Sequence, residues 1–143
     1  MGVPKFPVRR HKNMRLIGSA VQRYFSMVIR IKRAYETPTE DDGYRILVDR
    51  LWPRGISKAK AKIDFWPKEL APSTDLRRWY GHDPAKWSEF KSRYFAELDA
   101  NIELIKELFD YVRRGTVTFI YSSKEQDLNN AVALRGYIES LTP

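Results

Sequence analysis

The chain has 143 residues, 43% of them hydrophobic, a formal charge of +8 and no cysteine. This length supports one domain around a single core and leaves no room for a second. The lack of cysteine excludes a disulfide framework, thiolate metal ligands and a cysteine nucleophile. There is no apolar run of about eighteen residues and no secretory signal pattern, so we expect a cytoplasmic protein with no membrane partner.

The positive charge is concentrated at the beginning of the chain. Residues 1–27 hold six of the 26 lysines and arginines and no acidic residue, whereas the remainder is close to neutral. We expect residues 1–26 to be a basic extension, either disordered or upstream of the true start, and residues 27–143 to be a single α/β domain. A basic arm can bind nucleic acid through the phosphates, but such attraction is common, and we do not favour it as the role.

The first third of the domain predicts two strands joined by one helical turn. Residues 28–35 alternate apolar and basic side chains, as an edge strand does. Thr37, Pro38 and Glu40 match a capping box closed by Gly43. Residues 45–49 contain an unbroken ILV run, which is typical of a strand covered on both faces.

The middle of the chain predicts helices. Ser57 and Ser73 can cap two short helices, the second ending at Gly81. A long apolar pattern at three- and four-residue steps then extends from Pro84 to Gly115. One helix of that length would measure about 45 Å, more than a compact domain of this size spans, so we expect a break near Asn101.

A last strand is predicted over residues 116–121, and an amphipathic helix follows Ser122 and Ser123. Strands separated by helices predict an α/β domain with a small, largely parallel sheet and helices packed on it. The connection across residues 35–45 is short for a parallel crossover, so an antiparallel pair there, and hence a mixed sheet, is the alternative.

Basic and hydroxyl side chains follow two of the predicted strands. DRLWPRG begins at Asp49, and SSKEQ begins at Ser122. Ligands of open α/β sheets lie beyond the carboxyl ends of the strands, and helix N-termini favour anions. If the two strands are neighbours, the donor side chains of both segments converge on a phosphate or carboxylate: Arg50, Arg54, Ser122, Ser123 and Lys124. The alternative is purely structural, with Arg54 paired to Asp49 or Glu69 and a serine capping the last helix.

His82 is the only histidine outside residues 1–26. It could exchange protons with Asp49 or Asp83 as an orienting partner, although Asp83 is equally explained as a helix cap. A metal site is not expected because a second histidine is missing. No Walker loop or dinucleotide fingerprint occurs, so we expect no cofactor.

Three long motifs resemble domain-of-unknown-function family 488, in its YeaO-like branch. They are RILVDRLWPRGISKAKAKIDFWPKELAPS, LRRWYGHDPAKWSEFKSRYFAEL and VTFIYSSKEQDLNNAVAL, and the resemblance covers about residues 27–141. It implies motif positions rather than a reaction. These include Asn129, in addition to positions already discussed, and Leu128 stands where relatives typically have histidine.

Two functions are therefore carried forward. The first is an enzyme or sensor for a small anionic, phosphate- or nucleotide-like ligand. The second is a module without catalysis. It would either associate with nucleic acid, through the basic extension and further basic residues of the domain, or bind another protein. Those basic residues are Lys58, Lys60, Lys62, Arg77 and Arg78.

Overall fold

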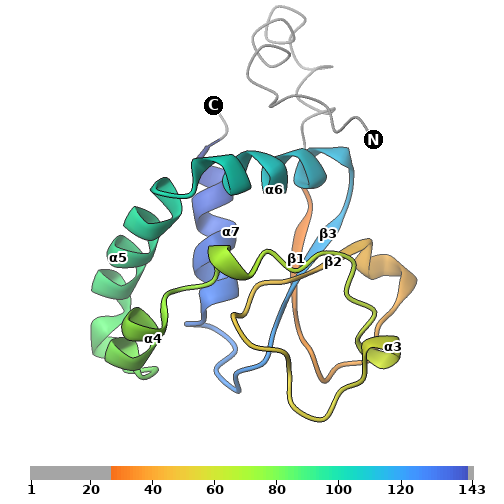
Figure 1. The fold of residues 1–143 in the computed structure, drawn as a ribbon, viewed down its shortest axis with the longest axis horizontal. Helices are drawn as coiled ribbons and strands as arrows, with labels where there is room; N and C mark the ends of the chain where they lie inside the picture. Colours follow the sequence, from red (N-terminus) through yellow and green to blue (C-terminus); the bar gives the residue numbers. More distant parts are fainter. Residues whose placement is uncertain (1–26, 142–143) are drawn as a thin grey trace, which may run out of the picture.

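The computed structural model describes residues 27–141, which contain a three-stranded parallel sheet (Figure 1). Its strands are β1 (Ile29–Arg33), β2 (Tyr44–Leu47) and β3 (Val117–Tyr121). They are ordered β1-β3-β2, so β3 is central and β1 is an edge strand, as its alternation predicts. The α/β prediction is confirmed, and of the two alternatives for the sheet the parallel one is correct. Residues 34–43 are long enough to lead the chain back to the starting end of the sheet.

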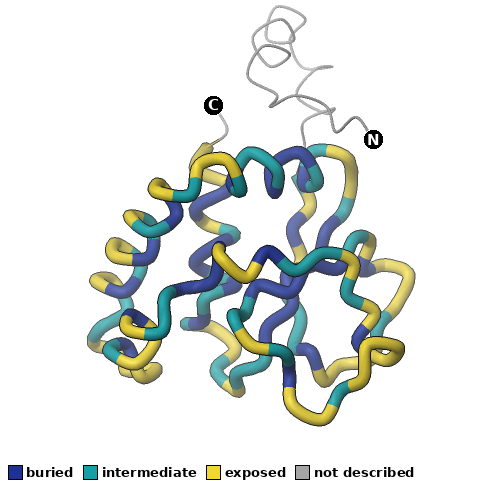
Figure 2. The backbone as a smooth tube through the Cα atoms, in the orientation of Figure 1, coloured by how far each residue is buried: buried dark blue, intermediate teal, exposed yellow. Residues whose placement is uncertain are grey.

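Each face of the sheet is covered by a different part of the chain. The main core lies between the sheet and the helices, and includes Ile46, Tyr94, Phe119 and Leu134. A smaller cluster on the other face is covered by the segment after β2, where Leu47 and Ile120 contact several partly buried side chains: Trp52, Ile56, Ile63 and Trp66. Figure 2 shows that buried residues follow the strands and that exposed residues follow the outer loops. β2 is therefore covered on both faces, as its unbroken apolar run predicts.

The turn before β2 is one 3-10 turn, η1 (Glu40–Asp42), ending at Gly43. The capping prediction placed the cap two residues too early: the N-cap is Thr39, and Asp42 closes the box by accepting from the Thr39 backbone N–H at 3.0 Å. Asp42, and not Glu40, closes the capping box because its carboxylate is held in place by two ion pairs. It is fully buried and lies 2.5 Å from Arg45 and 3.0 Å from Lys32.

The middle of the chain forms short elements followed by two long helices. The short ones are α3 (Lys58–Ala61), η2 (Lys68–Leu70), α4 (Thr74–Tyr80) and η3 (Pro84–Lys86), and Ser57 and Ser73 cap α3 and α4 as predicted. The long helices are α5 (Trp87–Asp99) and α6 (Ile102–Arg114), which confirms the break near Asn101. No helix within residues 27–141 combines the length and the apolar character that a membrane span requires.

The last helix, α7 (Asn130–Ser140), begins eight residues later than Ser122. The prediction that Ser122 and Ser123 open this helix is therefore wrong. Its N-cap is Asn129, whose side-chain oxygen accepts from the Val132 N–H at 2.9 Å. Residues 122–129 instead form a loop that Arg33 holds, because its guanidinium donates to the carbonyl oxygens of Ser122 and Ser123 at 3.0 and 2.8 Å.

Candidate functional site

A cavity of about 360 Å³ lies at the carboxyl ends of β2 and β3. It forms where the strands end side by side, as the two strand-end motifs predicted: the Ser122 backbone N–H donates to Asp49 Oδ2 at 2.8 Å. This volume is within the range of small-molecule pockets. Apart from these two residues, the wall contains both apolar and polar side chains: Tyr35, Arg50, Leu51, Trp52, Pro53, Arg54, Ala71, Pro72, Arg77, Tyr80, His82, Phe90, Ser123 and Asn130.

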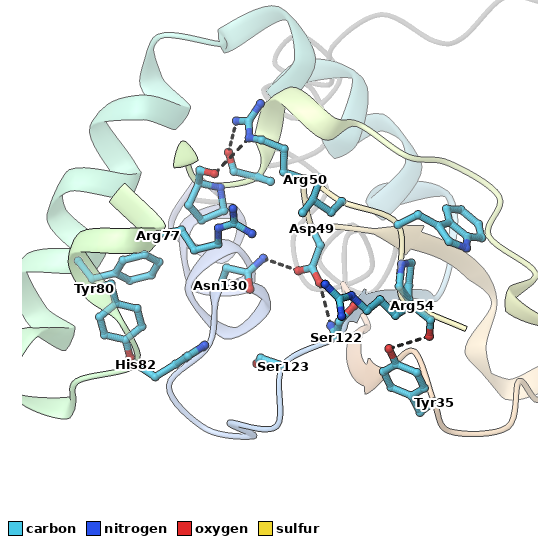
Figure 3. A pocket seen from close by; sticks show the side chains of 16 residues that line it. Tyr35, Asp49, Arg50, Arg54, Arg77, Tyr80, His82, Ser122, Ser123 and Asn130 are labelled. Atoms are coloured by element: carbon cyan, nitrogen blue, oxygen red, sulfur yellow. Dashed lines mark hydrogen bonds between the residues drawn. The ribbon is translucent and has the colours of Figure 1, made fainter. Parts of the chain in front are cut away.

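Asp49 is the acidic residue of this wall, and both of its carboxylate oxygens are held. Oδ2 accepts from Ser122 N, and Oδ1 accepts from Asn130 Nδ2 at 3.1 Å, while the same Asn130 amide donates to Val48 O at 2.9 Å (Figure 3). Burial raises the pKa of Asp49, and the hydrogen bonds from Asn130 and Ser122 and the charge of Arg77 oppose that rise. The carboxylate is thereby fixed in position at the centre of the site.

Aromatic side chains donate hydrogen bonds to the backbone of the corner that DRLWPRG forms. Trp66 Nε1 donates to Asp49 O at 2.7 Å, and Trp52 Nε1 donates to Ile56 O at 2.6 Å. The two indoles meet edge to face at 5.5 Å. Tyr35, from the loop after β1, donates its hydroxyl to Arg54 O at 3.0 Å. The tryptophan side chains therefore stabilise the backbone of this corner.

The two arginines of the motif have different surroundings. Arg50 donates to the carbonyl oxygens of Ala71 and Pro72 at 2.9 and 3.3 Å, which ties the corner to the segment before α4. Arg54 is exposed, and no carboxylate or carbonyl of residues 27–141 accepts from its guanidinium. The structural alternative, an ion pair with Asp49 or Glu69, is absent from the part of the chain that the structure describes.

A second guanidinium of the cavity wall comes from α4. Arg77 lines the cavity on the side opposite the Arg54 loop, together with Tyr80 one turn further along the same helix (Figure 3). Within residues 27–141 its guanidinium makes no hydrogen bond or salt bridge, although its charge acts on the Asp49 carboxylate. Sequence reasoning assigned Arg77 only to a nucleic-acid surface. The signal that could have placed it is the three-residue step to Tyr80, which puts both side chains on one helix face.

The remaining predicted ligand residues are only partly brought together. Ser122 and Ser123 line the cavity, whereas exposed Lys124 does not. Asn129 is buried as the α7 cap, and its amide donates to Glu125 O at 2.9 Å. Its neighbour Asn130 is the asparagine that reaches the cavity. Sequence reasoning missed Asn130, although two successive asparagines at a helix start cannot both occupy the cap position.

His82 and Asp83 differ in their relation to the cavity. His82 is exposed at the edge, with a positive φ of 56°, and its ring lies 5.7 Å from that of Tyr80. Asp83 is not among the residues that line the cavity, and it caps η3 by accepting from the Ala85 N–H at 3.0 Å. No hydrogen bond joins His82 to Asp49 within residues 27–141. Those residues also contain no group of three side chains able to hold a metal ion.

The comparisons with known proteins agree with the motifs. A family model described as "Inactive DUF488-N3 subclade" matches residues 28–142. "Uncharacterized protein YeaO" of Escherichia coli is 41% identical over 115 residues, which are 80% of this chain and all of YeaO. "Uncharacterized protein Rv3073c" of Mycobacterium tuberculosis is 41% identical over 106 residues, 74% of this chain and 89% of that protein. No solved structure is significantly similar.

The family model covers β1 to α7, and thus every element that contributes to the cavity. The cavity is consequently formed entirely by residues that the family model matches. From this agreement of motifs and comparisons, the chain belongs to the DUF488 family, in its YeaO-like branch.

Proposed function

We propose that the domain binds a small organic anion in the cavity at the ends of β2 and β3, without catalysing a reaction on it. The observation that carries this proposal is the pair of guanidinium groups, Arg54 and Arg77, that line one cavity and make no hydrogen bond or salt bridge within residues 27–141. Arginine binds phosphate and carboxylate groups bidentately through its planar fork of N–H donors.

The contrast with other arginines of the domain supports this assignment. Arg45 is used in the core by Asp42, and Arg33 and Arg50 donate to backbone carbonyl oxygens. The guanidinium groups of Arg54 and Arg77 make no such hydrogen bonds within residues 27–141. Their position around a concave, largely apolar wall instead fits an anion with an organic body.

Binding is favoured over catalysis by the placement of the predicted proton-transfer groups. A general base must lie within about 3 Å of its orienting partner or of the proton that it takes. Asp83 is used as a cap, and His82 has no hydrogen bond to Asp49. The description of the matching family model as inactive supports the same choice.

A thermal-unfolding experiment with phosphorylated compounds tests this function. A ligand at ten times its Kd stabilises the folded state by about 1.4 kcal/mol, which raises the melting temperature by several degrees. We expect glycerol 3-phosphate, used as a first probe, to produce such a rise at millimolar concentration. Arg77→Ala should weaken the binding at least about tenfold, because one charge-assisted interaction is lost.

The matched control is Arg78→Ala, which removes an exposed arginine from the same helix but outside the cavity wall. This variant should bind the probe as the parent protein does. Equal loss in both variants would mean that the anion responds only to the net charge of the surface, and it would refute the proposed site.

A further inference from the structure

The part of the cavity wall that lies between Arg54 and Arg77 is polar and preorganised. Asp49, Ser122 and Asn130 come from the end of β2, the end of β3 and the start of α7. Hydrogen bonds of 2.8 to 3.1 Å connect them and anchor Asn130 to Val48 O. Figure 3 shows this group lying between Arg77 and the Arg54 loop. A molecule whose anionic group contacts the arginines would bring its remaining atoms against these three side chains.

Two side chains of this group, Asp49 and Ser122, can form further hydrogen bonds. A carboxylate can accept about four hydrogen bonds, and Asp49 accepts one at each oxygen from the described residues. The Ser122 hydroxyl oxygen is buried and has no partner of normal hydrogen-bond geometry within residues 27–141. The hydroxyl also interacts with the Asp49 carboxylate, which opposes the rise that burial causes in the pKa of that group. A buried hydroxyl without a well-formed hydrogen bond is costly, so a ligand group that completes it is favoured.

The chemistry of the two residues selects the kind of group that fits. Asp49 in its ionised form accepts only, whereas the Ser122 hydroxyl can donate as well as accept. A ligand hydroxyl can donate to Asp49 and accept from Ser122 at the same time. An ammonium group offers donors alone and leaves the serine hydrogen unused, and an alkyl group satisfies neither residue.

We propose that the cavity takes a hydroxylated organic anion, with the anionic group on Arg54 and Arg77 and a hydroxyl group on Asp49 and Ser122. This inference rests on the proposed function and adds the class of ligand to it. A polyol or sugar phosphate is the simplest molecule of this class. Discrimination comes from the buried polar pair, because a ligand lacking the hydroxyl leaves both capacities unsatisfied.

A pair of probes that differ only in hydroxyl groups tests the inference. Titration calorimetry of the full chain with glycerol 3-phosphate and with propyl phosphate gives two dissociation constants. We expect glycerol 3-phosphate to bind at least about tenfold more tightly, the usual effect of a hydrogen bond to a charged group. Equal constants would overturn the inference and leave the anion site of the proposed function intact. If neither these compounds nor inorganic phosphate binds, both proposals fail.

The Ser122→Ala variant tests whether the cavity causes the difference in affinity between the two probes. Its backbone N–H remains available to Asp49, and only the weaker interaction of the hydroxyl with that carboxylate is lost. The variant should therefore still fold, with an unfolding equilibrium constant within about fivefold of the parent's, or about 1 kcal/mol in free energy. The difference between the two probes should shrink at least about threefold. Ser92→Ala, an exposed serine of α5, is the control and should keep the full difference. A difference that persists unchanged in Ser122→Ala would contradict the inference.

Discussion

Arg50 and Arg54 lie four residues apart in the DRLWPRG motif, but their surroundings differ. Arg50 is half-buried and donates to the carbonyl oxygens of Ala71 and Pro72. Arg54 is exposed and unpaired within residues 27–141. The cost of removing a side chain depends on the partners it leaves unsatisfied, so the two arginines can be distinguished by their effect on stability.

We predict that Arg50→Ala lowers the free energy of unfolding by about 1.5–3 kcal/mol, because two backbone acceptors lose a charged donor. Arg54→Ala should change it by less than about 0.5 kcal/mol, as exposed substitutions usually do. Urea denaturation of both variants checks these values. A cost of several kcal/mol for Arg54→Ala would indicate a structural partner and would remove Arg54 from the anion site.

The buried Asp42 gives a prediction with a defined pH dependence. Its pKa is lowered to about 2: burial acts to raise it, but hydrogen bonds from Thr39, Lys32 and Arg45 together outweigh burial. Since the folded pKa is below the ordinary value of 3.8, the ionised form stabilises the fold. That contribution is complete above about pH 4 and is lost as the pH falls toward 2.

Asp42→Asn should therefore destabilise the protein at pH 7 by about 3–5 kcal/mol, because Lys32 and Arg45 lose their shared carboxylate. Denaturant unfolding at a series of pH values should show the gap between variant and parent narrowing below about pH 4. A gap that stays constant down to pH 3 or below, or widens there, would show that Asp42 is not the titrating group.

At the scale of elements, Gly43 sets how η1 and β2 approach β3. Its φ is +63°, and a Cβ added there would lie 2.1 Å from Thr116 O. Gly43→Ala should thus cost at least about 2 kcal/mol, from the backbone conformation and from the steric overlap. Gly136→Ala, in α7 with open space around it, should instead stabilise by about 0.5–1 kcal/mol. Equal effects of the two substitutions in thermal denaturation would contradict this reading.

The strand ends could be predicted from the sequence because apolar runs followed by polar clusters have one simple interpretation in α/β domains. The start of α7 could not. Ser122 and Ser123 are good caps by residue type, but tertiary contacts decide, since Arg33 holds their carbonyl oxygens from β1. Likewise Asn130 enters the site only because α7 packs on β3 and β1 with its first residue donating to Val48 O, just after β2, a juxtaposition that local patterns do not encode.

At the scale of the whole molecule, the described fold has its own core and its own buried ion network within residues 27–141. YeaO aligns over its entire length to 115 residues of this chain. We predict that deleting residues 1–26 leaves the melting temperature within about 2 °C of that of the full chain. Calorimetry checks this, and a large drop would mean that the deleted segment belongs to the core.

The same truncated protein separates the anion site from the nucleic-acid alternative. Residues 27–143 should keep binding glycerol 3-phosphate and lose any salt-sensitive affinity for nucleic acid that the full chain has. If the truncated protein still binds nucleic acid with a steep salt dependence, the basic surface of the domain itself is responsible.

We propose above that an anion binds between Arg54 and Arg77 beside the ends of β2 and β3. Amide chemical shifts of ¹⁵N-labelled protein titrated with glycerol 3-phosphate test it most directly, because they locate the ligand on the chain. We predict saturable shifts at Ser122, Arg54 and Arg77, and their disappearance in the Arg54→Ala/Arg77→Ala double variant. Shifts confined to the exposed lysines of α3 or to residues 1–26, with Ser122 unmoved, would contradict the proposed site.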